Sequence, residues 1–415
     1  MKSSTKHYLG FLYFALAIGG LYWSQFFTSF LFWLALTGGI VSLCFFLRYL
    51  ITAFSRLETE RIDNTTILAG ALGISLLTME GLILAYAQLS IMDLDTALPR
   101  NPPLLVAGAY DEQAHAAMKS RHGVISMPDS WARKSIKNSN NFYWHGALHE
   151  LDDNKMRRQR SFPSARADTL RIMVVGDSLT YGVGIEKKFT YPAILQRLLS
   201  TEFRVEVLNL GISGYQSEDT LENIKKFLPK LEPDLLIYGV CLNDYLPSGR
   251  GQSASDDWAL PLPVAWKDFF IQRTRVAQLA RDAYHQLLLQ TDLRLDFLDD
   301  ILLDFEGYQG RFSRDVTEMA RFAKKNETPF ISMVLHQSPA TSGRVHAIIT
   351  ATEAHLAAAG ANPVTINPYL IAYQDQVLRV SQWEEHPNEL ANALFASMLV
   401  PAVTEAVDLS AYQLR

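Results

Sequence analysis

Residues 170–180 have the sequence LRIMVVGDSLT, a short apolar run that ends in Gly176-Asp177-Ser178. From this point on the chain alternates short apolar runs with amphipathic segments, which is typical of parallel strands joined by crossover helices. The predicted strands are 170–175, 205–210, 234–240, 330–335 and 363–366. The predicted helices between and after them are 192–199, 217–228, 276–289, 313–324, 345–359 and 390–407. The sequence therefore predicts a three-layer α/β/α sandwich around a five-stranded parallel sheet.

Chemically useful side chains follow several of these strands. Ser178 follows the first strand, Gly211 the second and Asn243 the third, while the last leads into a loop with His386. Ligands of such sheets bind beyond the carboxyl ends of the strands. A serine nucleophile needs an adjacent base, and the oxyanion formed on attack needs donors aimed at it. We therefore predict acyl transfer through Ser178, with His386 as base and the Ser178 and Gly211 N–H groups and the Asn243 amide as oxyanion hole.

A third group has to hold the imidazole of His386 in the right tautomer, and two acidic residues are close enough in sequence to do so. They are Glu384 and Glu385. Glu384 is favoured because alternate residues of an extended segment share an orientation. Glu385, or a Ser-His dyad without an acid, remains the alternative.

The blocks at the strand ends resemble the SGNH hydrolase superfamily, the GDSL-type esterases. The matching residues, within about 165–405, are Gly176-Asp177-Ser178-Leu179-Thr180, Asn209-Leu210-Gly211, Leu242-Asn243-Asp244 and His386-Pro387-Asn388. The resemblance implies a flavodoxin-like fold, Ser178 as nucleophile, Gly211 and Asn243 as oxyanion donors and His386 as general base.

The sequence departs from this family at two positions. Cys241 stands where the third block usually has Gly, and Trp383 stands where the last block usually has Asp. The alginate acetylation proteins of the superfamily place the acid two residues before the histidine, which would select Glu384. The departures leave a non-catalytic polysaccharide-binding or assembly protein as an alternative.

Three further residues are candidates for the substrate pocket. Asp177 adjoins the serine and is expected mainly to organise its loop, Cys241 could form a pocket wall, and His336 follows the fourth strand. A hydrogen-bonded structural role is the alternative for His336. The sequence contains no metal motif, P-loop or dinucleotide fingerprint, so we expect neither a metal nor a cofactor.

The first 92 residues differ in composition from the rest. Residues 8–47 contain no Asp, Glu, Lys, Arg or His, and a membrane-spanning helix needs about 20 apolar residues. We expect three transmembrane helices at about 8–24, 26–47 and 66–92, a juxtamembrane linker and lead-in at 93–168, and a hydrolase domain at 169–415. The basic residues flanking the spans predict, by the positive-inside rule, a multi-pass protein of the cytoplasmic membrane with its catalytic domain on the periplasmic side.

Charge and cysteine content exclude other classes. Residues 1–92 hold five of the 38 Lys and Arg and four of the 43 Asp and Glu, which leaves the remainder with a net charge of −6. An acidic domain argues against nucleic acid as a partner. The chain has two cysteines, Cys44 and Cys241, which lie far apart and on opposite sides of the predicted membrane boundary, so a disulfide framework is not expected.

The leading interpretation is a membrane-anchored serine esterase that cleaves an acyl ester, either an O-acetyl group on envelope polysaccharide or a lipid ester. The alternative enzyme is an O-acyltransferase that uses the same residues with a sugar hydroxyl as acceptor and a membrane acyl-donor partner. Glu80, in the middle of the third span, could contact such a partner or bond within the helix bundle.

Overall fold

The computed structural model describes residues 105–121, 139–153, 155–157, 168–248, 301–302, 304–336, 343–366, 370, 372–373, 375–381 and 384–414. They all fall in one compact unit, Met92–Asp257 together with Leu288–Arg415. The three predicted spans, Glu80 and the helix predicted at 276–289 lie outside the described residues. Among the helices that are described, none is long and apolar enough to cross a membrane.

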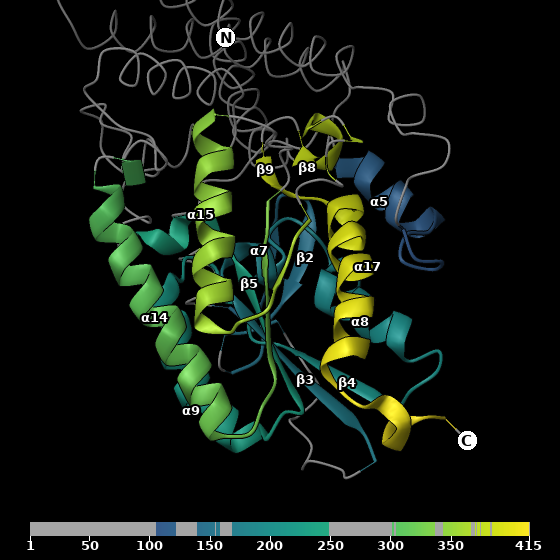
Figure 1. Cartoon of the computed structure of the whole chain (residues 1–415). Coiled ribbons are helices and arrows are strands. Elements are labelled where there is room, and N and C mark those ends of the chain that lie inside the picture. The colour runs from purple at the N-terminus through teal and green to yellow at the C-terminus, as the bar shows by residue number, and fades with distance from the viewer. Residues whose placement is uncertain are drawn as a thin grey trace, which may run out of the picture. The chain divides into compact units, whose positions relative to one another are not determined.

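A five-stranded parallel sheet forms the centre of the described unit (Figure 1). Its order is β4-β3-β5-β6-β7, with β3 between β4 and β5. The carboxyl end of β3 therefore lies at the point where the strand order reverses, which is where open α/β sheets bind ligands. The predicted five-stranded parallel sheet is confirmed, with strands β3 (Leu170–Gly176), β4 (Val205–Asn209), β5 (Leu235–Val240), β6 (Phe330–Val334) and β7 (Pro363–Val364).

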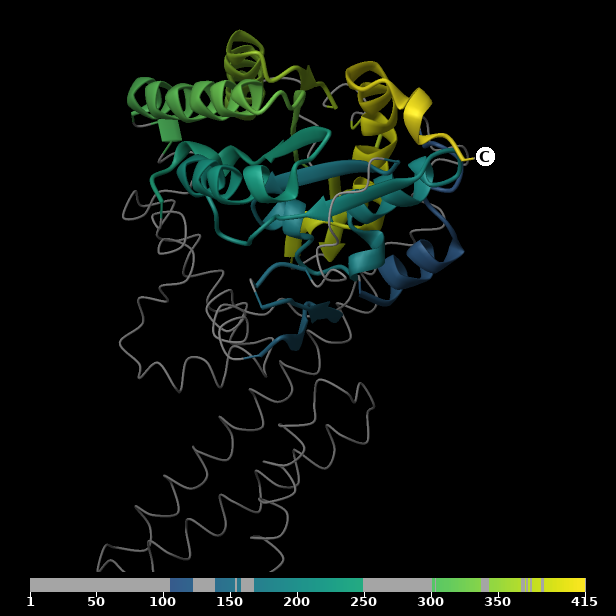
Figure 2. The same cartoon turned by 90° about the horizontal axis from the view of Figure 1, so that it is seen from below.

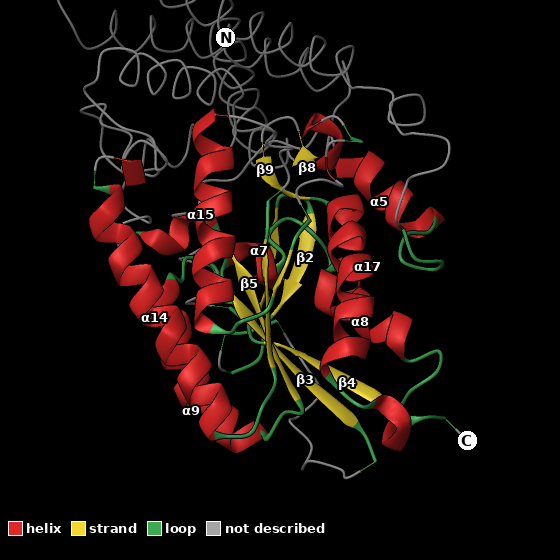
Figure 3. Cartoon of the chain, in the orientation of Figure 1, coloured by secondary structure: helices red, strands yellow, loops and turns green. Residues whose placement is uncertain are grey.

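Helices cover both faces of this sheet (Figure 3). On one face α8 (Tyr191–Leu199) packs against α17 (Glu389–Ala406). On the other, α14 (Phe305–Lys325) contacts both α9 (Ser217–Leu231) and α15 (Gly343–Ala359). Figure 2, turned by 90°, shows green α14 and α15 well apart from yellow α17. The predicted three-layer sandwich is confirmed.

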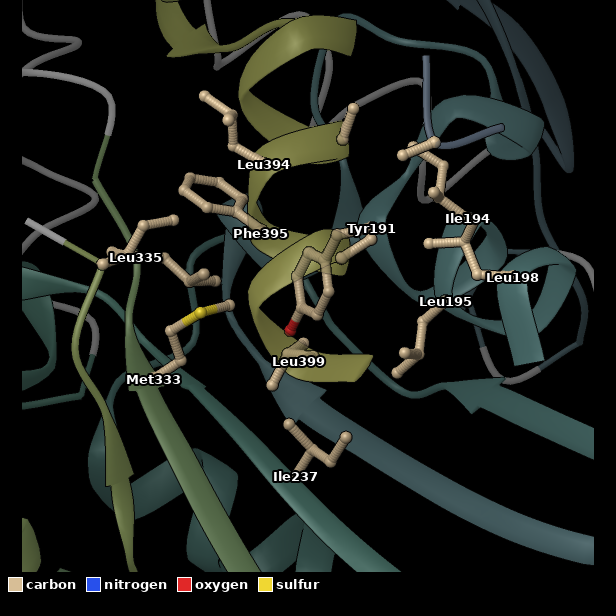
Figure 4. Packing of buried hydrophobic residues seen from close by; sticks show 14 of the residues in the cluster. Tyr191, Ile194, Leu195, Leu198, Ile237, Met333, Leu335, Leu394, Phe395 and Leu399 are labelled. Carbon is tan, nitrogen blue, oxygen red and sulfur yellow. The ribbon is translucent and has the colours of Figure 1, made fainter. Parts of the chain in front are cut away.

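Each face of the sheet has its own hydrophobic core, because successive side chains of a strand point to opposite faces. From β3, Ile172 and Val174 pack toward α8 and α17, whereas Met173 packs toward α9 and α14. In the first of these cores the rings of Tyr191 and Phe395 meet edge to face, with centroids 6.2 Å apart (Figure 4). β3 is buried along its whole length, as expected for a central parallel strand.

Shorter elements complete the described unit. The pair β8–β9 is antiparallel and lies outside the main sheet. The bounds are α7 (Ser178–Tyr181), η2 (Lys187–Phe189), η3 (Leu242–Tyr245), η4 (Asp375–Leu378), β8 (Arg379–Ser381), β9 (Glu384–Pro387) and η5 (Leu409–Tyr412).

The described part of the predicted lead-in packs into the same core. It forms α5 (Glu112–Arg121) and an antiparallel hairpin of β1 (Asn141–Trp144) and β2 (Ala147–Glu150). Met118 of α5 joins the core of α8 and α17, and Trp144 of β1 clusters with Tyr181 at the end of α7. These segments are therefore packed structural elements of the α/β domain.

Candidate active site

The turn after β3 carries Asp177 and Ser178 at the carboxyl end of the central strand. Asp177 is the N-cap of the short helix α7, since its Oδ1 accepts a hydrogen bond of 2.9 Å from the N–H of Leu179. Its Oδ2 accepts a hydrogen bond of 3.0 Å from the hydroxyl of Ser178. Asp177 is fully buried, while Ser178 is partly exposed. The turn thus presents Ser178 at the edge of the sheet, and Asp177 organises it.

Close backbone packing fixes this turn. Gly176 has a φ of 151°, and a Cβ at this position would collide with Oγ1 of Thr180 and the carbonyl oxygen of Gly239. The hydroxyls of Thr180 and Tyr191 are hydrogen-bonded at 3.0 Å. Glycine alone lets the ends of β3 and β5 approach α7 so closely, so Ser178 sits on a backbone with little freedom.

Strand β9 brings a carboxylate against His386. Oε1 of Glu384 lies 2.5 Å from Nδ1 of His386 and accepts a hydrogen bond of 3.2 Å from its backbone N–H. Glu384 is 9% exposed, whereas the side chain of Glu385 is 75% exposed and pairs with Arg379 at 2.8 Å. β9 also contacts α7, the helix that begins at Ser178. Glu384, and not Glu385, thus contacts the imidazole of His386. Glu384 and His386 lie next to α7, the helix that begins at Ser178.

Two imidazoles keep Glu384 ionised. Burial by itself would raise the pKa of this carboxyl, but the charges of His145 and His386 outweigh burial and hold the pKa well below its ordinary value of 4.5. One imidazole lies on each oxygen, with Nε2 of His145 2.8 Å from Oε2 and Nδ1 of His386 2.5 Å from Oε1. A carboxylate that stays charged can orient His386 and stabilise the imidazolium that forms when His386 takes a proton.

The three predicted oxyanion donors differ in their present partners. The N–H of Ser178 opens α7 and has no carbonyl partner within that helix. The N–H of Gly211 donates to Oδ1 of Asn209 at 3.0 Å, and a Cβ on Gly211 would lie 2.5 Å from the backbone nitrogen of Tyr181. Asn243 is partly exposed in η3, and its buried Oδ1 has no hydrogen-bond partner among the described residues. The backbone of Gly211 therefore packs against α7, the helix that begins at Ser178. Asn243 lies in the turn of η3 that follows the end of β5.

Sequence comparison assigns this arrangement to a family. Residues 174–393, more than half of the chain, match the GDSL-like Lipase/Acylhydrolase family. The chain belongs to this family. It is a hydrolase that acts on ester bonds, and the matched range contains Ser178, Gly211, Asn243 and His386.

Several solved structures are similar to this GDSL-like acylhydrolase. TesA is 16% identical and matches over 57% of this chain and 99% of its own, with a TM-score of 0.35. The acetyl xylan esterase AlAXEase is 14% identical over 56% of this chain and 100% of its own, with a TM-score of 0.35. LAE5, an alpha/beta hydrolase enzyme from the metagenome of Lake Arreo, Spain, is 16% identical over 60% and 99%, with a TM-score of 0.37. No curated protein sequence matches the chain.

Cys241, which departs from the family pattern, is partly buried and contacts the serine turn through Asp177. Its thiol is hydrogen-bonded to Asp177, and its N–H donates to Oδ2 of Asp244 at 2.8 Å. The hydroxyl of Tyr238 donates to the same oxygen at 2.8 Å. Burial and the neighbouring carboxylates of Asp177 and Asp244 raise the pKa of the Cys241 thiol well above its ordinary value. Cys241 is therefore a protonated thiol that donates to the N-cap of α7.

The other predicted pocket residue, His336, is buried just after β6 and is 7% exposed. Its ring thus lies at the carboxyl end of the strand next to β5. Trp383 lies outside the described residues. Within the residues that the structure describes, no group of three or more His, Cys, Asp and Glu side chains could hold a metal ion.

The sequence reasoning missed His145, which contacts Glu384 from the β1–β2 hairpin. The hairpin had a sequence signal, because Phe142 and Trp144 are apolar at alternate positions and His145-Gly146 stands at a two-residue turn. Nothing in that pattern, however, indicates that the turn reaches the loop of His386. That contact is a property of the folded chain.

Proposed function

We propose that this chain is a membrane-anchored serine esterase in which Ser178, His386 and Glu384 form the catalytic triad. The observation that carries the proposal is the buried contact of 2.5 Å between Glu384 and His386, on a strand that touches the helix of Ser178. A charged acid on an imidazole, next to a helix that begins with a serine, supplies the three groups that activate a serine nucleophile.

In the proposed reaction Oγ of Ser178 attacks the acyl carbon of the ester while Nε2 of His386 takes the hydroxyl proton. The alcohol leaves with that proton and an acyl-enzyme remains. Water then attacks the acyl carbon, again with His386 as base, and releases the acid and the free serine. Since the hydroxyl of Ser178 donates to Asp177 in the structure, Asp177 is the resting acceptor, and the hydroxyl turns to His386 for attack.

The oxyanion is stabilised in this proposal by the N–H of Ser178 and the side-chain amide of Asn243. Both groups follow the carboxyl ends of adjacent strands, β3 and β5. The N–H of Gly211 donates a hydrogen bond of 3.0 Å to the side chain of Asn209. It can therefore donate to the oxyanion only if this hydrogen bond is shared with the oxyanion or broken. Fixed donors of this kind act without reorganisation during the reaction.

We further propose that the substrate is an acyl ester on an envelope polysaccharide or a lipid, and that the catalytic domain faces away from the cytoplasm. The long uncharged segment at residues 8–47 supports anchoring in the membrane. A domain held there meets polymers and lipids of the envelope. We expect deletion of the gene to raise the ester content of isolated envelope polymer or lipid. A fall would indicate acyl transfer to the polymer instead.

The catalytic assignment is tested with the full-length chain, purified in detergent, and a chromogenic acetyl ester. We expect Ser178→Ala to lower the turnover by at least about a thousandfold, since it removes the nucleophile. Ser120→Ala, an exposed serine of α5, is the matched control and should keep wild-type turnover. Unchanged activity in Ser178→Ala would remove the basis of the proposal.

A further inference from the structure

The tip of the β1–β2 hairpin carries one buried side chain, which is unusual for a hairpin turn. His145 is buried, whereas Gly146 beside it is exposed. His145 and Gly146 form the turn with φ of 48° and 80°, the two positive values of a type I′ turn. Loop tips normally face solvent, yet the side chain of His145 is 1% exposed. The tight turn therefore places the imidazole of His145 in the interior of the domain.

The imidazole of His145 contacts the carboxylate of Glu384, which also contacts His386. Nε2 of His145 is 2.8 Å from Oε2 of Glu384, while Oε1 of the same carboxylate is 2.5 Å from Nδ1 of His386. Each oxygen of Glu384 thus has an imidazole of its own. A buried carboxylate with one oxygen unsatisfied would be costly and free to turn, so the second imidazole fixes the plane of the carboxyl group.

The hairpin is held in place by contacts to the helix of the serine. The ring of Trp144 stacks on His145 with centroids 5.5 Å apart, and Nδ1 of His149 is 3.0 Å from the hydroxyl of Tyr181, the last residue of α7. The guanidinium of Arg157 lies 5.2 Å from the centre of the Tyr181 ring. The hairpin therefore contacts both α7, which carries Ser178, and β9.

We propose that His145 is a positioning residue of the esterase reaction, which holds Oε2 of Glu384 so that Oε1 stays on His386. This inference rests on the proposed catalytic roles of Glu384 and His386. The charged and titratable groups around His145 are Glu384 and His386 on β9, His149 on β2 and Arg157 beyond it. His145 acts through Glu384, because the two imidazoles lie on the two oxygens of that one carboxylate.

The test compares His145→Phe and His145→Gln in the full-length chain with the chromogenic acetyl ester. Phe removes the ring nitrogen, so we expect kcat to fall by about 10- to 100-fold with KM within about twofold. The acidic limb of kcat/KM should move to lower pH, because a carboxylate that is no longer held on His386 stabilises the protonated form of His386 less strongly. Gln retains an N–H donor and should restore most of kcat. His115→Gln on α5 is the matched control and should keep wild-type kcat and pH profile.

A double-mutant cycle separates positioning from mere stability. If His145 acts through Glu384, His145→Phe should lower kcat much less in a Glu384→Gln background than in wild type. Fully additive effects would overturn the inference, and so would a wild-type kcat and pH profile in His145→Phe. The proposed function would survive either result as long as Ser178→Ala is inactive and Glu384→Gln keeps only a small part of kcat. If His145→Phe does not fold, His145→Gln provides the test instead. A kcat that is about 10- to 100-fold below wild type in His145→Gln, with a wild-type pH profile, would overturn the inference. Activity retained in Ser178→Ala would instead defeat the proposed function.

Discussion

The exchange Glu384→Gln isolates the charge of the proposed catalytic acid from its shape. Glutamine keeps the size of the side chain and an oxygen for His386, but it cannot stabilise the imidazolium by charge. Two unit charges about 4 Å apart at an effective dielectric constant of 20 interact by about 4 kcal/mol. The contact between Glu384 and His386 is buried and short, so this charge interaction is fully available to the transition state. We expect kcat to fall by about a thousandfold.

Glu385→Gln is the control, because it makes the same chemical change at the next residue. The carboxylate of Glu385 is 75% exposed and pairs with Arg379 at the surface. Exposed ion pairs contribute about 0–1 kcal/mol, so kcat should change by less than about fivefold. Steady-state hydrolysis of a chromogenic acetyl ester and thermal unfolding of both variants give the comparison. A loss in Glu385→Gln equal to or larger than that in Glu384→Gln would refute the assignment of the acid.

Two further predictions concern stability. Arg121 of α5 and Glu389 of α17 form an ion pair, and their side chains are 4% and 1% exposed. Arg121→Met should lower the free energy of unfolding by about 3–5 kcal/mol, because it leaves a buried charge unpaired, and adding Glu389→Gln should recover part of this loss. Thermal melts in which the double variant is no more stable than the single variant would contradict this. Because the folded-state pKa of Glu384 lies well below 4.5, its charge stabilises the fold above about pH 4.5 and this contribution is lost as the pH falls through the folded pKa. The difference in unfolding free energy between wild type and Glu384→Gln should therefore shrink on acidification, and a growing difference would be inconsistent with the structure.

Local patterns were sufficient for the sheet but less so for the ends of the helices. The apolar runs predict all five strands because parallel strands are buried on both faces. Helix α14, in contrast, begins at Phe305, well before the predicted start at Ser313. Gly307 and Gly310 lower the helix propensity of that segment. The cap formed by Asp304, which accepts a hydrogen bond from the N–H of Gly307 at 3.2 Å, and the burial of nearby aromatic side chains outweigh this propensity.

The candidate site was predictable where its residues follow strands. Parallel topology brings the carboxyl ends of β3 and β5 to one edge, so the approximate place of Ser178 and Asn243 follows from the strand pattern alone. The engagement of the Gly211 N–H by Asn209 did not follow, because a side-chain hydrogen bond over two residues depends on the local backbone angles.

The alternation of strands and helices, and the order of the chemical groups at the strand ends, can be predicted from the amino-acid sequence, because both depend on short-range periodicity and on the geometry of a parallel sheet. Which acid meets His386 depends on the folded chain. In extended β9, Glu384 and His386 share one side and Glu385 points to solvent, but which side faces inward depends on packing against α7. The contact of His145 with Glu384 depends on the fold in the same way, since it joins segments far apart in the chain that have no local pattern in common.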